Sequence, residues 1–247
     1  MKSVTTKPPK LDDLKAELNK FADPQRAEHS KRFFKTGKGE YGYGDVFWGL
    51  TVPEQREIAR GYYGLLLQDI IKLLHSRVHE ERFTALILMV HRYQKGDEKI
   101  RTQVFDQYLK NTKWINNWDL VDTSTPQIVG DYCLRHALDD RLRRLSGSTS
   151  LWERRIAILA TFAYIRQGKV SLTLEMAQKM LNDKHDLIHK AVGWMLREAH
   201  KRKPDEVEHF LSKHAKNMPR VMLRYAIERM PEVKRKQMLG ASRASRH

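Results

Sequence analysis

The segment Trp118-Asp119-Leu120-Val121-Asp122 places an aromatic ring and a carboxylate four residues apart. On a helical turn, this spacing brings the Trp118 and Asp122 side chains to the same face. The chain around them carries a formal net charge of +16, so it attracts polyanions. A simple electrostatic clamp has no reason to set a carboxylate beside an indole in such a field. The pair therefore indicates chemistry in addition to binding.

The composition narrows the class of partner. Among 247 residues, 46 Lys and Arg stand against 30 Asp and Glu, which favours nucleic acid or an anionic membrane surface. Cys133 is the only cysteine, so an intramolecular disulfide and a multi-cysteine metal site are excluded, and a reducing, cytoplasmic setting is expected. The longest apolar runs, such as 83–90, are far shorter than the roughly 20 residues that span a bilayer. We expect no membrane span.

Helices are the elements that must position these side chains. Apolar residues recur at helical spacing through nearly all of the chain after Leu11, and sustained strand alternation is absent. Turn-forming residues interrupt the pattern at 37–45, 96–97, 146–150, 203–205, 218–219 and 230–231. The sequence predicts an all-α fold of short helices separated by turns.

Three similar stretches indicate internal repetition. They begin at Arg82, Arg154 and Lys190, which fits a period near 36 residues. Such a period is typical of two-helix repeats in which a small residue lets one helix approach its neighbour. We predict an α-solenoid, or superhelix, whose concave face is wide enough to cradle duplex DNA. It forms a single domain over 11–239.

The two ends of the chain differ from this domain. Residues 1–9 are polar and lack the apolar stretch of a signal peptide, so 1–10 is predicted to be a disordered arm. Between 219 and 247, eight Lys or Arg stand against two Glu, and 240–247 is predicted to be a basic, flexible tail. These cations could contact phosphate directly, or they could be a solvated helix face with a tail that aids solubility.

Four segments, taken together and in this order, carry a family resemblance. They are 46–53 with Arg56, 118–122, 152–159 and 191–198. The chain resembles the AlkD-like DNA alkylation repair family, which are DNA glycosylases built of HEAT-like helical repeats that remove alkylated purines. The resemblance covers roughly 11–239. Each segment is weak alone, whereas the ordered set is fairly specific.

The resemblance assigns roles to particular positions. Trp118, Asp122 and Trp194 match the family's sugar-cradling tryptophans and catalytic aspartate, and Arg155 matches an arginine that helps to hold the nucleic-acid backbone. Thr51 departs from the family pattern, in which a glutamine is often found near this place. The departure bears on lesion range and on contacts near the base, and it leaves the central set intact.

Further expectations complete the candidate site and its partners. We add Arg197 and Lys190 to the DNA-binding candidates. The partner is double-stranded DNA that contains alkylated purines; no cofactor, metal, membrane or protein partner is expected, and a monomer suffices for one lesion. The resemblance also implies action without base flipping, so contacts would fall on sugar and phosphate. The setting would be cytoplasmic, with the nucleoid as the bound location.

The chemistry of alkylated purines agrees with these roles. Alkylation at N3 or N7 leaves a positive charge on the base, which makes it a good leaving group that needs little general-acid help. As the bond breaks, an oxocarbenium ion develops on the deoxyribose, and a carboxylate such as Asp122 can stabilise it while orienting a water. The faces of Trp118 and Trp194 carry negative quadrupole charge that favours the same cation.

Ordinary structural roles compete with these assignments. Asp122 precedes Thr123-Ser124-Thr125-Pro126, a run suited to capping a helix that starts at the proline. The tryptophans could be packing residues, and Arg155 could be solvated or salt-bridged. His75 and His79 have metal-ligand spacing, yet no third ligand completes a motif, so we expect structural or surface histidines.

Two other classes of function stay open at this point. One is a catalytically inert helical-repeat module that recognises DNA shape, or a protein scaffold of the same geometry. The other is an RNA-binding repeat protein that stacks single-stranded bases on its aromatic side chains. The presence of Trp118, Asp122 and Trp194 argues against the inert module, and a preference for duplex DNA would remove the RNA-binding alternative.

Overall fold

The computed structural model describes residues 9–241, so most of the predicted arm (1–10) and tail (240–247) lies outside the described residues. The chain divides into two compact units, with the boundary between Ser124 and Thr125 at the end of a helix. Each unit has its own buried apolar core. Within the described residues there is no strand; the one β-bridge pairs Val46 with Val78. The predicted all-α fold is confirmed.

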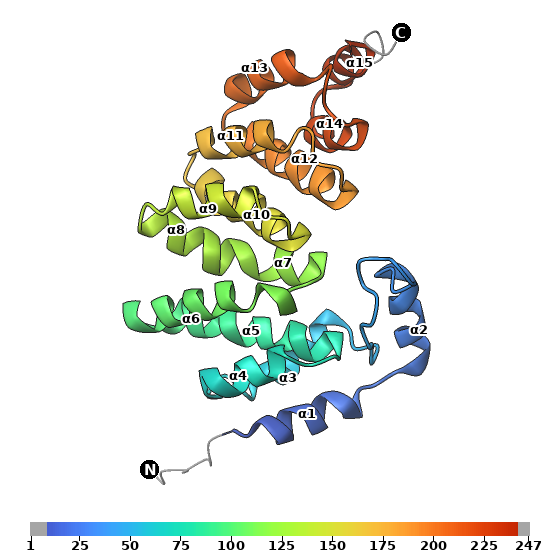
Figure 1. The fold of residues 1–247 in the computed structure, drawn as a ribbon, viewed down its shortest axis with the longest axis vertical. Helices are drawn as coiled ribbons and strands as arrows, with labels where there is room; N and C mark the ends of the chain where they lie inside the picture. Colours follow the sequence, from blue (N-terminus) through green and yellow to red (C-terminus); the bar gives the residue numbers. More distant parts are fainter. Residues whose placement is uncertain (1–8, 242–247) are drawn as a thin grey trace. The chain divides into compact units, whose positions relative to one another are not determined.

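The first unit is organised around one long helix, α5 (His79–Lys95). Helices α3, α4 and α6 all pack on it, which is why α5 is buried on nearly every face of its first three turns. The remaining elements are α1 (Leu11–Lys20), α2 (Pro24–Phe33), α3 (Val52–Arg60), α4 (Leu67–Leu74), α6 (Glu98–Lys110), the short 3-10 turn η1 (Thr112–Trp114) and α7 (Trp118–Thr125) (Figure 1).

The second unit repeats a simpler plan. Its helices are η2 (Pro126–Gly130, a π-helical turn), α8 (Asp131–Arg135), α9 (Asp139–Ser146), α10 (Leu151–Arg166), α11 (Ser171–Lys179), α12 (Asp186–His200), α13 (Pro204–His214), α14 (Arg220–Ile227) and α15 (Glu232–Ala241). Figure 1 shows α9–α10 and α11–α12 as successive helix pairs, and α13 and α14 both pack on α12. Helix α10 packs on α9 and α12, and α12 packs on α14, so each pair buries its apolar face on the next.

The three similar stretches of sequence lie in α5, α10 and α12, which are the most extensively buried helices of the two units. A small residue does let one of them approach its neighbour. A Cβ atom on Gly193 of α12 would lie 2.5 Å from the Met222 carbonyl oxygen and 2.5 Å from the Tyr225 Cβ, both on α14. The repeats predicted from sequence are therefore helical repeats in space, and the helical-repeat prediction is confirmed.

The single cysteine lies in the core. Cys133 is fully buried, and this burial raises the pKa of its thiol to about 12. In the part of the chain that the structure describes, no helix is both long and apolar enough to cross a membrane.

Candidate functional site

Trp118 and Asp122 lie on one helix, as their spacing predicts. Helix α7 begins at Trp118, whose backbone N–H donates to the Asn117 side-chain oxygen at 2.8 Å, while the Val121 N–H donates to the Asn117 carbonyl at 3.2 Å. Both candidate side chains are half-buried. The alternative that Asp122 caps a helix starting at the following proline is wrong, because Asp122 already stands inside α7.

Two phenylalanines hold the Trp118 ring. The ring of Phe34 stacks on it with centroids 5.4 Å apart, and Phe33 meets it edge to face at 5.7 Å. Phe33 is the last residue of α2 and remains 57% exposed, although aromatic side chains of this size are usually covered. The Trp118 indole therefore belongs to an aromatic cluster of the first unit in which the Phe33 ring is exposed to solvent.

A buried histidine lies beneath this cluster. His79, the first residue of α5, is only 3% exposed and packs against the rings of both Phe34 (4.9 Å) and Phe47 (4.7 Å). Its Nε2 lies 2.8 Å from the Asp119 Oδ2, and its Nδ1 lies 3.6 Å from the Asp45 Oδ2. Burial alone would lower the pKa of the imidazole, but the carboxylates of Asp119 and Asp45 raise it to about 9. His79 is consequently a cation at neutral pH.

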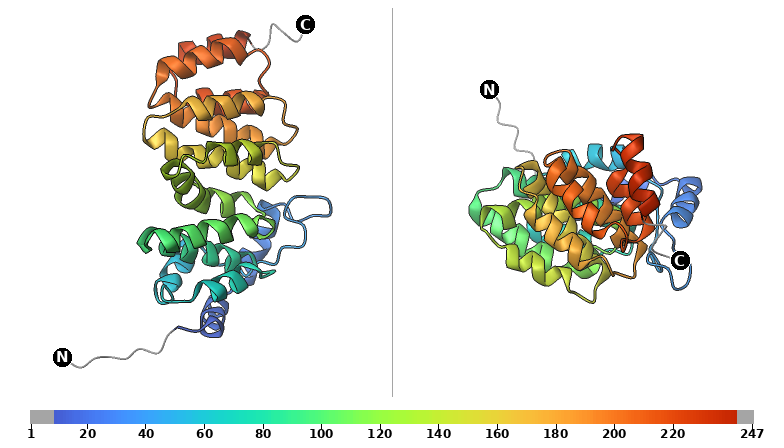
Figure 2. Two further views of the ribbon diagram at one scale, coloured as in Figure 1. Left: turned by 60° about the vertical axis from the view of Figure 1, so that its left-hand side comes forward. Right: turned by 90° about the horizontal axis from the view of Figure 1, so that it is seen from above.

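A loop joins α2 to α3 and carries two of these contacts. We call residues 34–45 the strap; it appears as the blue loop at the right of the left-hand view in Figure 2. Lys35, Gly39 and Gly44 adopt positive φ (52°, 84° and 87°), which allows the tight turns of the loop. The Asp45 end is fixed by Arg82 of α5, whose Nη2 lies 2.8 Å from the Asp45 Oδ2.

A second buried carboxylate fixes the chain just after the strap. Glu80 of α5 is 2% exposed and accepts hydrogen bonds from the backbone N–H groups of Trp48 (3.0 Å) and Gly49 (2.7 Å). Gly49 has a φ of 84°, and a Cβ there would lie 2.4 Å from the Asp23 carbonyl oxygen. Only glycine fits this close approach, so the first of the four family-like segments is tied to α5 by its backbone.

Trp194 belongs to the second unit. It lies on α12, half-buried, with its ring 6.2 Å from that of Phe162 on α10. The guanidinium carbon of Arg166 lies 4.5 Å above the Phe162 ring, a cation–π contact between residues one turn apart on α10. Sequence reasoning missed Phe162 and Arg166, although their spacing of four residues is a signal that could have pointed to them.

The predicted DNA-binding residues are already engaged within the protein. Arg155 is 4% exposed and its Nη1 donates to the Leu187 carbonyl, so it lacks the exposure expected of a phosphate ligand. Thr51 is the N-cap of α3: its hydroxyl accepts from the Glu54 N–H, and Glu54 accepts from the Thr51 N–H at 2.7 Å. The role of Thr51 in base-proximal contacts and that of Arg155 at the backbone stay predictions.

The remaining two candidates form ion pairs. Lys190 lies 2.6 Å from the Asp186 carboxylate one turn earlier on α12. Arg197 pairs with Glu228 and lies 3.5 Å from Glu198. Trp118 and Asp122 are thus placed together on α7, whereas Trp194, Arg155, Lys190 and Arg197 all lie in the second unit. The complete constellation stays a prediction.

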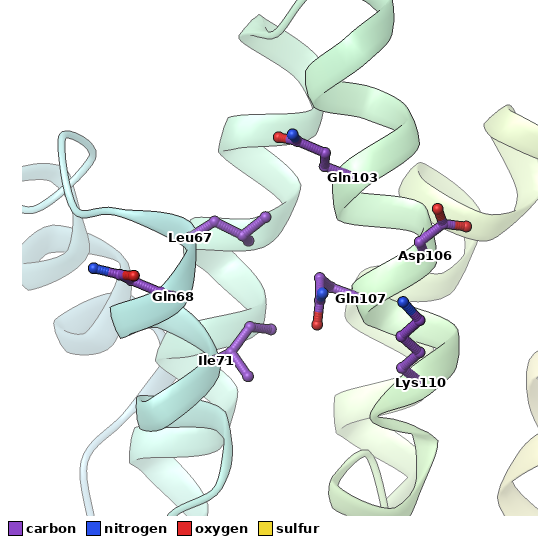
Figure 3. Close-up of a pocket in the computed structure, with 7 residues that line it drawn as sticks. All are labelled: Leu67, Gln68, Ile71, Gln103, Asp106, Gln107 and Lys110. Atoms are coloured by element: carbon purple, nitrogen blue, oxygen red, sulfur yellow. The ribbon is translucent and has the colours of Figure 1, made fainter.

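Metal and small-molecule sites are separate questions. Among residues 9–241, no group of three or more His, Cys, Asp and Glu side chains could hold a metal ion. A pocket of about 580 Å³ lies between α4 and α6, lined by Leu67, Gln68, Ile71, Gln103, Asp106, Gln107 and Lys110 (Figure 3). Its lining includes none of the candidate residues, so the pocket and the Trp118–Asp122 site are distinct.

Comparison with known proteins agrees with the helical-repeat class that the fold defines. The family model for DNA alkylation repair enzymes matches residues 14–230. The chain therefore belongs to the DNA alkylation repair enzyme family, as the four segments indicate, and this gives it a role in DNA alkylation repair. No curated protein matches the sequence.

One similar solved structure is a predicted DNA alkylation repair enzyme from Enterococcus faecalis. It shares 16% sequence identity, with a TM-score of 0.65, over 85% of this chain and 97% of that one. At this identity, the likeness supports the fold.

Proposed function

We propose that this chain is a monofunctional DNA glycosylase that hydrolyses the N-glycosidic bond of cationic N3- or N7-alkylated purines in duplex DNA. The observation that carries the proposal is the pairing of Trp118 and Asp122 on α7, four residues apart and both half-buried, in a member of this repair family. A half-buried carboxylate keeps contact with solvent while it is shielded enough to act strongly on a nearby cation.

The proposed reaction assigns each group a task. Asp122 stabilises the positive charge that develops at C1′ of the deoxyribose and orients the attacking water, while the cationic base leaves without a strong general acid. The Trp118 face, held by Phe34, packs on the sugar and favours its oxocarbenium character. Trp194 on α12 is the second tryptophan that the family resemblance assigns to the sugar.

Substrate access follows from where these groups act. The proposed contacts are with sugar and phosphate, so the damaged base need not enter a pocket. In keeping with this, the lining of the 580 Å³ pocket between α4 and α6 includes neither Trp118 nor Asp122. We propose that excision proceeds without base flipping, which would let the enzyme accept bulky adducts.

The test is release of 7-methylguanine from a duplex oligonucleotide by wild type and by Asp122→Asn, with binding to the same duplex followed in parallel. We expect the variant to lose at least about 100-fold in single-turnover rate, because a preorganised charge is removed, and to keep its affinity. Asp106→Asn is the matched control, since Asp106 is an exposed carboxylate of α6 in the same unit.

Three results would contradict parts of this proposal. Binding of duplex without release of N3- or N7-alkylpurines would favour the inert DNA-binding module. Tighter binding to single-stranded RNA than to duplex DNA would favour the RNA-binding alternative. Covalent trapping by borohydride would refute the monofunctional assignment, because a Schiff base would then form with a lysine.

A further inference from the structure

The Trp118 indole, the Phe34 ring, the His79 imidazole and the Asp119 carboxylate form a closed circuit. The first three rings follow one another with centroid separations of 5.4 Å and 4.9 Å. The His79 Nε2 then reaches the Asp119 Oδ2 at 2.8 Å, and Asp119 is joined to Trp118 by a peptide bond. Every member of the circuit is fixed from two sides.

We propose that His79 is a positioning residue, which sets the orientation of Trp118, and with it the first turn of α7, through this circuit. We call the four side chains, with Asp45 on the second nitrogen of His79, the clamp. An effect of His79 on catalysis rests on the proposed function. Its effect on the orientation of the Trp118 indole does not.

Both ends of the strap meet at this histidine. Phe34 is the first residue of the strap, and its ring lies tilted against the imidazole with centroids 4.9 Å apart; Asp45 is the last, with its Oδ2 3.6 Å from the Nδ1. Asp45 is held in turn by Arg82. A glycine-rich loop of this kind has many accessible conformations, so fixing its two ends on one buried side chain removes much of that freedom. The clamp therefore also determines where Phe33 and Phe34 present their rings to Trp118.

The two carboxylates of α7, Asp119 and Asp122, have different roles in this proposal. Asp119 is ion-paired with a buried imidazolium, so its negative charge is compensated inside the protein. Asp122 lies one turn further along α7, three residues after Asp119. Asp119 consequently acts through Trp118 and the start of the helix, and Asp122 keeps the chemical role proposed for it.

The test uses two variants that dissect the clamp. His79→Phe keeps a ring in the aromatic stack and removes both ion pairs, and Asp119→Asn keeps the shape and removes the charge. His75→Phe is the matched control, because His75 also stacks on a tryptophan (Trp114, 5.0 Å) and its Nε2 donates one hydrogen bond to the Asn111 Oδ1 at 2.6 Å, within the same unit.

The first readout needs no enzymatic activity. The chain has five tryptophans, so 5-fluorotryptophan labelling gives a small set of ¹⁹F signals, of which the Trp118 signal is assigned by Trp118→Phe. We expect this signal to shift or broaden in His79→Phe and Asp119→Asn and to stay unchanged in His75→Phe. An unchanged Trp118 signal in both clamp variants would overturn the proposal. If His79→Phe does not fold, Asp119→Asn carries the test.

The second readout separates positioning from general stability. In single-turnover release of 7-methylguanine, we expect the clamp variants to lose about 10- to 100-fold in rate at saturating DNA, because small misplacements of reacting groups are costly, with little change in duplex Kd. A purely structural role would instead lower the melting temperature and leave the rate of the folded fraction intact. Absence of release by wild type would defeat the proposed function, and the ¹⁹F spectra would still decide the clamp.

Discussion

Arg82 and Arg154 make the same two hydrogen bonds in different units of the chain. The Nη1 of Arg82 donates to the carbonyl oxygens of the residues six and five positions earlier, at 3.1 and 3.2 Å, and the Nη1 of Arg154 does the same at 3.0 Å each. Each guanidinium also pairs with an acid from another element, Asp45 in one case and Asp183 in the other. The similarity between the stretches that begin at Arg82 and Arg154 therefore reflects a shared set of contacts. In both, the arginine stabilises the turn that leads into its helix, α5 or α10.

These contacts predict a large loss of stability on truncation. In Arg154→Ala, two turn carbonyls lose their donor and the nearly buried Asp183 loses its cation, so we expect the free energy of unfolding to fall by about 2–4 kcal/mol. Urea denaturation followed by circular dichroism measures the change. Arg144→Ala removes the same charge from an exposed position on α9, and it should leave the midpoint almost unchanged. Equal effects of the two substitutions would contradict the role of Arg154.

The close crossing of α12 and α14 gives a second prediction. Gly193→Ala would force a methyl group to within 2.5 Å of backbone and Cβ atoms of α14, so the helices must separate. We expect a loss of about 2–3 kcal/mol in unfolding free energy, measured by urea denaturation. Gly147→Ala is the control: its Cβ would meet only the Arg144 carbonyl, at an ordinary 3.7 Å. A tolerated Gly193→Ala would mean that the two helices are not held this closely in solution.

The charged clamp predicts a pH dependence of stability. Because the pKa of His79 is raised from 6.5 to about 9 on folding, its stabilising contribution is complete below pH 6.5 and is lost as the pH rises towards 9. Unfolding free energy should therefore fall between pH 6.5 and 8.5, by up to about 1.4 kcal/mol per pH unit for this one proton. In His79→Gln this slope should disappear.

Other groups limit the window for that measurement. Burial lowers the pKa of His91 and of His185, so both affect stability mainly below pH 6.5. The buried Cys133 thiol, whose pKa is raised to about 12, destabilises the fold only above the ordinary thiol range. Urea titrations from pH 6.5 to 8.5 thus isolate His79, and an equal slope in wild type and His79→Gln would contradict a charged imidazole in the clamp.

Features that depend on residues close together in the sequence could be predicted from the sequence. Helical spacing predicted the all-α fold, the stretches at Arg82, Arg154 and Lys190 fell in three corresponding helices, and the four-residue interval between Trp118 and Asp122 placed both on α7. Each of these inferences depends on residues within one or two turns of each other, and backbone geometry fixes such relationships directly.

Relationships between distant residues were not predictable in this way. His79 and Asp119 are 40 positions apart in the sequence, and no local pattern predicts that their side chains are in contact. Arg155 shows the same limit, because no local pattern shows that tertiary packing buries its side chain against the Leu187 carbonyl. The partners of a long polar side chain depend on which helices pack together, and that is a property of the whole unit.

The last prediction concerns which cation near Trp194 contacts DNA. Lys190 and Arg197 are paired with acids, whereas no ion pair joins Arg166 within residues 9–241; it lies over the Phe162 ring, is exposed, and Phe162 contacts Trp194. We therefore expect Arg166→Ala to weaken binding to undamaged duplex and to reduce the slope of log Kd against log salt by about 1, since one phosphate contact releases about one counterion.

Lys190→Ala serves as the control for this measurement. Lys190→Ala and Arg166→Ala each remove one positive charge. Lys190 is already paired with Asp186, so we expect only the Arg166 substitution to remove a phosphate contact. Fluorescence anisotropy at four salt concentrations gives both slopes. A slope that changes with Lys190→Ala and not with Arg166→Ala would reverse the assignment, and it would place the DNA backbone along α12 rather than at the end of α10.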